Sequence, residues 1–156
     1  MRILFVCTGN TCRSPIAESL LRDLATKSSL NLEVRSAGVS TMDGLSISEM
    51  AEAVLCEQGI SVKHASQTIN QELINWADIV LAMTNSHKYT LWHDFHQQKD
   101  KIYVLKEFID PSCSVRKLDI YDPFGGDINV YRDCMQELLT ELQLLISKIL
   151  EANCCE

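Results

Sequence analysis

Cys7 and Arg13 bracket the segment CTGNTCR, which lies between an apolar run and a stretch of helical periodicity. A short loop that joins a buried strand to a helix directs its backbone N–H groups, and the positive end of the helix dipole, at one point. Gly9 is expected to relieve the backbone where φ is positive. Arg13 adds a planar guanidinium that holds two oxygens at once. The segment therefore predicts a binding site for a tetrahedral oxyanion.

Cys7 is expected at the floor of the same site. A thiol beside amide dipoles, a helix N-terminus and a guanidinium is expected to have a pKa well below that of a free cysteine. Its thiolate could attack a bound phosphorus in line and form a cysteinyl-phosphate, with Ser14 donating a hydrogen bond to the sulfur. A bare C-x5-R spacing also occurs around buried structural cysteines, but the strand-to-helix setting favours catalysis.

Four short apolar runs bounded by turn residues predict buried strands at residues 3–6, 32–34, 79–83 and 102–105. Helical periodicity between and after them predicts helices that start near Pro15 and Ser46 and others at residues 71–76, 86–97 and 129–150. Ser14 is the expected N-cap of the first helix, and Ser46 with Glu49 resembles a capping box. Gly59 is the expected C-cap of the second helix.

Strands that alternate with helices at these spacings indicate an α/β fold with right-handed crossovers. We expect one domain over residues 1–156, a three-layer α/β/α arrangement with a four-stranded parallel sheet, and the catalytic loop between the first strand and the first helix. Residues from about 152 to 156 are expected to form a frayed tail. The long segment 106–127 is predicted to be irregular and functional.

The composition restricts the partners. A net charge of −7 over 156 residues disfavours nucleic acid as a partner, because phosphate backbones are met by clustered Lys and Arg. No apolar run reaches the length of a membrane span, so no membrane contact is expected. Seven cysteines without a secretory signal indicate reduced thiols. The expected location is the cytoplasm.

The segment CTGNTCRSPIAE resembles the signature of the low-molecular-weight protein tyrosine phosphatase family. Four further segments resemble the family in the same order, namely Ser36-Ala37-Gly38, Trp76-Ala77-Asp78, Met83-Thr84 and Asp122-Pro123. The resemblance covers nearly the whole chain. It implies a four-stranded parallel sheet, hydrolysis of phosphorylated protein side chains, and a mechanism that needs no cofactor.

The same resemblance implies roles for four more residues. Asp122 would protonate the leaving group and later deprotonate the water that hydrolyses the phosphoenzyme; the alternative is that Asp122-Pro123 is only a turn. Asn10 would hold the loop in a strained shape, and His64 would support it, although His64 could equally be a loop histidine without a role. Cys12 would form a reversible disulfide with Cys7 and protect it from overoxidation.

Thr11 is the position that bears on the substrate. Tyrosine-directed members of the family commonly have an apolar residue there, and two tyrosines where this chain has Phe124-Gly125. Thr11 with DPFGG resembles the bacterial branch of the family that dephosphorylates arginine in proteins. The chemistry is consistent with this, because the hydroxyl of Thr11 and the carboxylate of Asp122 can both accept hydrogen bonds from a guanidinium. In the alternative, Phe124 stacks on phosphotyrosine. The expected phosphate- and substrate-binding residues are Thr8, Gly9, Asn10, Thr11, Cys12, Ser14 and Phe124.

Three other kinds of site fit the sequence less well. Arsenate reduction would need two further cysteines as a relay after the third strand, where the sequence has none, although folding could bring Cys113 near. Non-catalytic oxyanion binding would need neither a nucleophile nor an acid. His87, His93 and His96 are interpreted as solvated helix residues, and no metal site is expected.

Overall fold

Four parallel strands form one sheet in the computed structural model, which describes residues 1–153. The spatial order is β2-β1-β3-β4, so β1 lies in the interior between β2 and β3. The strands are β1 (Arg2–Cys7), β2 (Glu33–Gly38), β3 (Ile79–Ala82) and β4 (Ile102–Val104). The prediction of an α/β fold around a four-stranded parallel sheet is confirmed.

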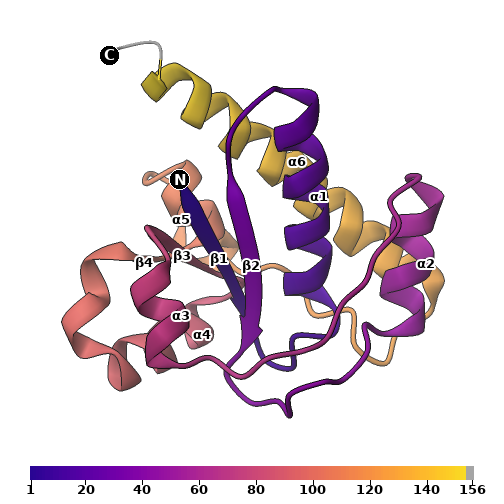
Figure 1. Cartoon of the computed structure of the whole chain (residues 1–156), viewed down its shortest axis with the longest axis horizontal. Helices are drawn as coiled ribbons and strands as arrows, with labels where there is room; N and C mark the ends of the chain where they lie inside the picture. Colours follow the sequence, from indigo (N-terminus) through magenta and orange to yellow (C-terminus); the bar gives the residue numbers. More distant parts are fainter. Residues whose placement is uncertain (154–156) are drawn as a thin grey trace.

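Helices cover both faces of this sheet (Figure 1). The α-helices are α1 (Arg13–Lys27), α2 (Glu49–Glu57), α3 (Gln71–Trp76), α4 (Asn85–Asp94), α5 (Leu105–Ile109) and α6 (Ile128–Asn153). Two 3-10 helices, η1 (His96–Lys101) and η2 (Val115–Lys117), lie in the connections. Helices α1 and α6 pack on one face, α3 and α4 on the other, and α2 packs against α1 and α6. No helix in residues 1–153 has the length and apolar character needed to cross a membrane.

Strand β1 explains why both faces are covered. Ile3 and Phe5 belong to the core under α1 and α6, whereas Leu4 and Val6 belong to the core under α3 and α4. All four side chains are fully buried. Because successive side chains of a strand point to opposite faces, a run of four apolar residues requires apolar layers on both sides.

The carboxyl ends of the strands meet at one edge of the sheet, at the bottom of Figure 1. There the amide of Met83, after β3, donates to the carbonyl of Val6, and the amide of Val39, after β2, donates to the carbonyl of Cys7. These bonds hold the ends of β2 and β3 against the end of β1. The loop from β1 into α1 therefore starts from a fixed point, as expected for an open α/β sheet.

Two helix starts differ from the prediction. Helix α1 begins at Arg13 with Cys12 as its N-cap, so Ser14 is not the cap. The N-cap of α2 is Ser48, whose Oγ accepts from the amide of Ala51 at 3.3 Å, and not Ser46. Gly59, with φ of 74°, lies one position beyond the C-cap Gln58, where the left-handed residue that ends a helix usually stands.

Four boundaries also differ. Strand β2 continues to Gly38, four residues beyond its predicted end, because Ser36 is buried and hydrogen-bonded inside the core. The segment 106–127 is not wholly irregular, since it includes most of α5 and all of η2. The helix predicted at 86–97 ends at Asp94 and continues as η1. Helix α6 runs to Asn153, so residues 152 and 153 are helical and not frayed, while 154–156 lie outside the described residues.

The outer edge of β2 is occupied by hydrogen bonds from other parts of the chain. The guanidinium of Arg22, on α1, donates to the carbonyl of Val34 at 2.6 and 3.1 Å. The side chain of Gln67 donates to the carbonyl of Ser36 at 2.9 Å. The amide of Ile69 donates to the carbonyl of Gly38 at 2.9 Å. Three successive outward-facing carbonyls of β2 are therefore already paired.

Candidate active site

A pocket of about 220 Å³ lies over the loop between β1 and α1. Eight of the eleven residues proposed from the sequence line it: Cys7, Thr8, Gly9, Thr11, Cys12, Arg13, Asp122 and Phe124. The other three do not line it: Asn10 and Ser14 hydrogen-bond to the sulfur of Cys7, and His64 lies against the backbone carbonyl of Asn10. The fold thus brings the loop after β1 together with residues 122 and 124, more than 100 positions later in the sequence, at the carboxyl edge of the sheet.

The sulfur of Cys7 is buried at the base of the pocket. Its side chain is only 3% exposed. The Oγ of Ser14 lies 2.9 Å from Sγ, and the amide of Asn10 donates to Sγ over 3.3 Å. Both contacts come from the loop and from the first turn of α1, so the sequence segment that carries the cysteine also supplies its hydrogen-bond donors.

Asn10 fixes the direction of these hydrogen bonds. The backbone amide of Gln67 donates to Oδ1 of Asn10 at 2.9 Å, so Nδ2 is the donor on the other side of the carboxamide. Nδ2 donates to Oγ of Ser14 at 2.9 Å and to Oγ of Ser36 at 2.8 Å. Since Oγ of Ser14 accepts from Asn10, its own proton is available to the sulfur of Cys7. In the same way Ser36 donates to Glu18 at 2.5 Å.

Burial raises the pKa of the Cys7 thiol above its ordinary value. The hydrogen bonds from Ser14 and from the amide of Asn10, and the charge of Arg13, act in the opposite direction and lower it. The sequence-based expectation of a depressed pKa counted these donors and omitted the burial of the sulfur, and the direction it gave is wrong here. Ionisation of Cys7 therefore depends on how well its donors are placed.

Arg13 is buried, with 5% of its surface exposed, and its guanidinium is held from two sides. Nη1 donates to the carbonyl of Ile120 at 3.2 Å, and Nη2 lies 3.2 Å from the carboxylate of Asp122. The Asp122 side chain is half-exposed, at 52%, and its other oxygen accepts from the amide of Phe124 at 3.2 Å. Asp122 therefore stands at the solvent side of the pocket and Cys7 at its base.

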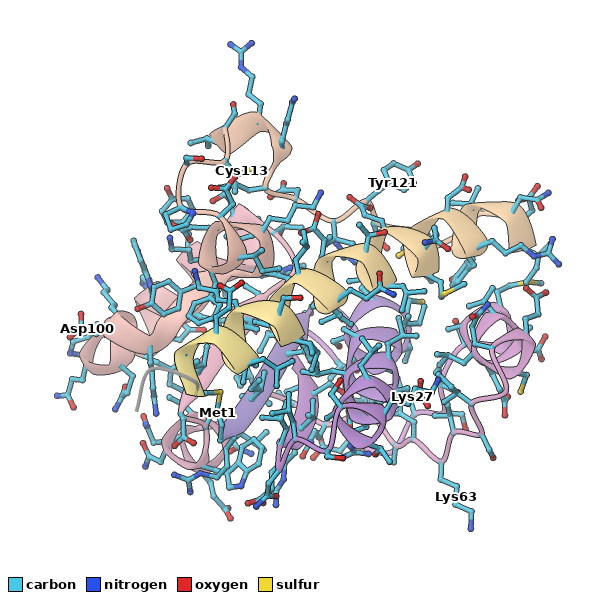
Figure 2. All side chains as sticks on the ribbon, turned by 90° about the horizontal axis from the view of Figure 1, so that it is seen from above. Met1, Lys27, Lys63, Asp100, Cys113 and Tyr121 are labelled. Atoms are coloured by element: carbon cyan, nitrogen blue, oxygen red, sulfur yellow. The ribbon has the colours of Figure 1, made fainter. Side chains whose placement is uncertain are left out.

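The segment that carries Asp122 is at the surface. Figure 2 shows Tyr121 projecting outward beside the N-terminal half of α6. Tyr121 and Phe124 are 70% and 80% exposed, respectively. Of these two side chains Phe124 lines the pocket, as the one aromatic residue to do so within residues 1–153, and its ring is free to contact a bound molecule.

The left-handed residue of the loop is Asn10, with φ of 55°, and not Gly9, whose φ is not positive. The glycine that the loop needs is Gly38. A Cβ at Gly38 would lie 2.5 Å from the carbonyl oxygen of Thr8 and 3.2 Å from Cβ of Asn10. The prediction for Gly9 was therefore wrong, whereas the segment Ser36-Ala37-Gly38 contributes Ser36 and Gly38 directly to the shape of the loop.

Thr11 and Cys12 face different surroundings. Thr11 lines both the main pocket and a neighbouring hollow of about 390 Å³, which is formed with Gly9 and residues 40–42 and 45. The sulfur of Cys12 lies 3.2 Å from the hydroxyl of Tyr131 and 3.4 Å from that of Ser48. Burial raises the pKa of Tyr131 to about 12, so this hydroxyl keeps its proton. Cys7 and Cys12 are both free thiols.

Two histidines contact the loop. Nε2 of His64 lies 2.6 Å from the backbone carbonyl of Asn10. His87 is 6% exposed and lies 2.8 Å from the hydroxyl of Thr8. The interpretation of His87 as a solvated helix residue was therefore wrong, although His93 and His96 are exposed. The sequence signal that could have found it is its position three residues after Thr84, the N-cap of α4 at the carboxyl end of β3. No three metal-ligating side chains form a group within residues 1–153.

Comparison with known proteins agrees with this geometry. Residues 2–154 match the low molecular weight phosphotyrosine protein phosphatase family. The chain belongs to that family. Among its relatives, the protein-arginine-phosphatase of Geobacillus stearothermophilus is 46% identical over 148 residues, with 95% of each chain covered. The protein-arginine-phosphatase of Bacillus subtilis is 42% identical over 151 residues, with 95% of this chain and 98% of that chain covered.

Solved structures of the family have the same fold. The C7S mutant of YwlE arginine phosphatase, with a phosphorylated active site serine, superposes with a TM-score of 0.91 at 40% identity, covering 96% of this chain and 95% of the other. The family thus accounts for the combination of loop, sheet and pocket in this chain.

Proposed function

We propose that this chain hydrolyses phosphorylated arginine side chains of proteins through a cysteinyl-phosphate intermediate. The observation that carries the proposal is the arrangement of one pocket of about 220 Å³, with a buried thiol at its base, a guanidinium beside it and a carboxyl group at its solvent side. A nucleophile, an anion clamp and a proton donor are the three components that this reaction requires.

In the first step the sulfur of Cys7 attacks phosphorus, and the bond from phosphorus to the leaving nitrogen breaks. The thiolate is the reactive form, and the Ser14 hydroxyl, the Asn10 amide and the charge of Arg13 favour it. Arg13 and the loop amides hold the equatorial oxygens. Asp122 donates a proton to the leaving guanidine, so arginine departs as a guanidinium cation.

In the second step water attacks the phosphorus of the cysteinyl-phosphate. Asp122, now a carboxylate, accepts a proton from that water, and the bond between sulfur and phosphorus breaks. Inorganic phosphate leaves and the thiolate of Cys7 is restored. The hydrogen bond that Ser14 donates to the sulfur stabilises the thiolate as a leaving group in this step, as it stabilises the nucleophile in the first.

Two features support arginine as the substrate. Thr11 and Asp122 line the same pocket, so a hydroxyl and a carboxylate are both available to the N–H groups of a guanidinium. In addition, the relatives at 42% and 46% identity are named protein-arginine-phosphatases. One feature favours phosphotyrosine as a second candidate, namely the exposed ring of Phe124 at the pocket rim, which can stack on a phenyl group.

The mechanism is tested by replacing the nucleophile. The variant Cys7→Ser should lose turnover of an aryl phosphate by at least about 1,000-fold and still bind inorganic phosphate, because the amides and Arg13 remain. Asp122→Ala should slow the hydrolysis of phosphoarginine more than the hydrolysis of an aryl phosphate whose leaving group needs no proton. Full activity of Cys7→Ser would exclude the mechanism. If the wild type itself hydrolysed no phosphoryl compound, non-catalytic oxyanion binding would be favoured instead.

The substrate assignment is tested with phosphoarginine and phosphotyrosine peptides. The wild type should prefer phosphoarginine, and Thr11→Ile should shift kcat/KM toward phosphotyrosine. Thr11→Ser is the matched control, because it keeps the hydroxyl and should keep the preference. A wild type that prefers phosphotyrosine, or a preference that Thr11→Ile leaves unchanged, would replace the arginine assignment with the tyrosine one.

The proposed setting is the cytoplasm, with phosphorylated proteins as substrates and inorganic phosphate as the product that binds the same loop. Five cysteines in the described residues are free thiols, namely Cys7, Cys12, Cys56, Cys113 and Cys134, which supports a reducing compartment. An arsenate-reduction assay with a thiol reductant distinguishes the phosphatase from the alternative of an arsenate reductase.

A further inference from the structure

A chain of hydrogen bonds runs from the start of α4 to the pocket. Oγ1 of Thr84 lies 3.0 Å from Nδ1 of His87, and Nε2 of His87 lies 2.8 Å from Oγ1 of Thr8. Thr8 lines the pocket together with Cys7 and Arg13, whereas Thr84 and His87 do not line it. The chain therefore joins the end of β3 to the phosphoryl-binding loop at the end of β1.

The surroundings of His87 favour the neutral imidazole. Burial is the main cause and the charge of Arg13 the second, and together they lower the pKa of His87 to about 4. The carboxylates of Asp119 and Asp122 act in the opposite direction and do not compensate. A neutral imidazole has one N–H and one acceptor nitrogen, so its two hydrogen bonds must run in a single direction.

Thr84 indicates which direction this is. Its Oγ1 already accepts a hydrogen bond from the backbone amide of His87 at 3.2 Å, as the N-cap of α4. Within residues 1–153, Nδ1 of His87 is the one acceptor in reach of the Thr84 hydroxyl proton. If Thr84 donates to Nδ1, the proton of the ring is on Nε2, and Nε2–H donates to Oγ1 of Thr8.

We propose that His87 is a positioning residue, which accepts from Thr84 and donates to Thr8 so that the Thr8 hydroxyl is left as a hydrogen-bond donor in the phosphoryl pocket. The proton of Thr8 then has no acceptor among residues 1–153 and is available to an oxygen of the bound phosphoryl group. This inference rests on the proposed function, and it adds a side-chain donor to the loop amides and Arg13.

The loop geometry supports a donor at this position. The backbone carbonyl of Thr8 accepts from the amide of Ser40 at 3.0 Å, so the main chain of Thr8 is held while its side chain is exposed. The hydroxyl of Thr8 can therefore change its direction only by rotation about the side-chain bond of Thr8 itself. The contact with Nε2 of His87 opposes that rotation.

A double-mutant cycle tests whether His87 acts through Thr8. Thr8→Val, at an exposed position, should lower kcat/KM for an aryl phosphate by about 10-fold or more and should weaken inhibition by inorganic phosphate by a similar factor. His87→Leu should have the same effect, and the double variant should be no worse than Thr8→Val alone. Thr140→Val, the same substitution on an exposed part of α6, is the matched control and should change nothing.

The contradicting outcomes are distinct. Additive effects of Thr8→Val and His87→Leu would reduce His87 to a packing role and overturn the proposal, as would wild-type kinetics in Thr8→Val. His87→Gln keeps an N–H donor near the position of Nε2 and should recover most of the activity lost in His87→Leu. Failure of this recovery in a variant that melts at the wild-type temperature would also count against the proposal.

The tautomer is measured without any activity assay. In protein with ¹⁵N-labelled histidine, the ring nitrogens of His87 should give the spectrum of a neutral imidazole protonated at Nε2, unchanged between pH 7 and 5.5. A neutral ring protonated at Nδ1 would overturn the proposal. If the wild type hydrolyses no phosphoryl compound, the proposed function fails, while the tautomer and the effect of Thr8→Val on phosphate binding still test this inference.

Discussion

Asn10 hydrogen-bonds to several separate parts of the candidate active site. Its backbone has φ of 55°, its amide donates to the sulfur of Cys7, and its carboxamide contacts Ser14, Ser36 and Gln67. A short polar side chain tolerates the left-handed region better than other non-glycine residues because it bonds locally. The loop therefore keeps its strained shape through hydrogen bonds to three separate segments of the chain.

Ser14 should control the ionisation of Cys7. Its hydroxyl proton is directed to the sulfur because its oxygen accepts from Asn10. Ser14→Ala removes this donor, so the pKa of Cys7 should rise further, because the hydrogen bond from Ser14 is one of the contacts that lower it. The measurement is the pH dependence of Cys7 alkylation by iodoacetamide. Ser19→Ala, on the same helix, is the control, and an unchanged midpoint in Ser14→Ala would contradict this role.

At the level of elements, the sequence predicted which helices and strands exist and in what order, but it predicted where they begin and end less well. Buried strands and the helix at residues 71–76 were found because apolar periodicity is strong there. The end of β2 was missed because Arg35 and Ser36 are polar. The burial of Ser36 is explained by its hydrogen bonds to Asn10 and Glu18, which form only in the folded chain. The start of α1 was misplaced because Ser14, a typical cap residue, is used by the sulfur of Cys7.

The residues that line the pocket could be predicted from the sequence, whereas their burial and pKa shifts could not. Cys7, Arg13 and Asp122 could be selected from spacing and resemblance, since loop chemistry is local in sequence. The raised pKa of Cys7 and the burial of His87 could not, because both depend on helices that pack against the loop from distant segments. The same reason explains why Gly38 was seen as part of a motif but not as the glycine that makes space for the loop.

The end of β2 should be as sensitive to substitution as the loop itself. Gly38→Ala places a Cβ 2.5 Å from the carbonyl oxygen of Thr8, which is backbone and cannot move without displacing the loop. We expect a loss of about 2 to 3 kcal/mol in the free energy of unfolding and a weaker affinity for inorganic phosphate. Urea denaturation and phosphate inhibition measure the two effects. Gly9→Ala is the matched control, since its Cβ would meet Thr11 at an ordinary 3.6 Å.

At the scale of the whole molecule, His87 links the stability of the fold to pH. Its pKa is lowered to about 4 in the folded chain, against about 6.5 when unfolded, so the unfolded state binds the proton first as the pH falls. The contribution of His87 to the free energy of unfolding is therefore complete above about pH 6.5 and is lost progressively as the pH falls to about 4. Between pH 7 and pH 5 this residue should cost about 2 kcal/mol in the free energy of unfolding.

The comparison of two variants isolates this effect from carboxylates that titrate at lower pH. Urea unfolding of the wild type should weaken between pH 7 and pH 5, and the decrease should be smaller by about 2 kcal/mol in His87→Gln, which has no proton to gain. His93→Gln, at an exposed site on the same helix, should follow the wild type. Equal pH dependence in the wild type and in His87→Gln would mean that His87 titrates normally in the folded chain.

The paired outer edge of β2 has a consequence for behaviour in concentrated solution. A parallel sheet ends in strands whose free carbonyls and amides can recruit a strand from another molecule. Here Arg22, Gln67 and Ile69 already use the outward carbonyls of β2, and Arg22 is itself held by Glu18 at 2.6 Å. Two copies of the chain therefore meet no row of unpaired carbonyls along this edge of β2, so this edge is a poor template for a strand from a second molecule.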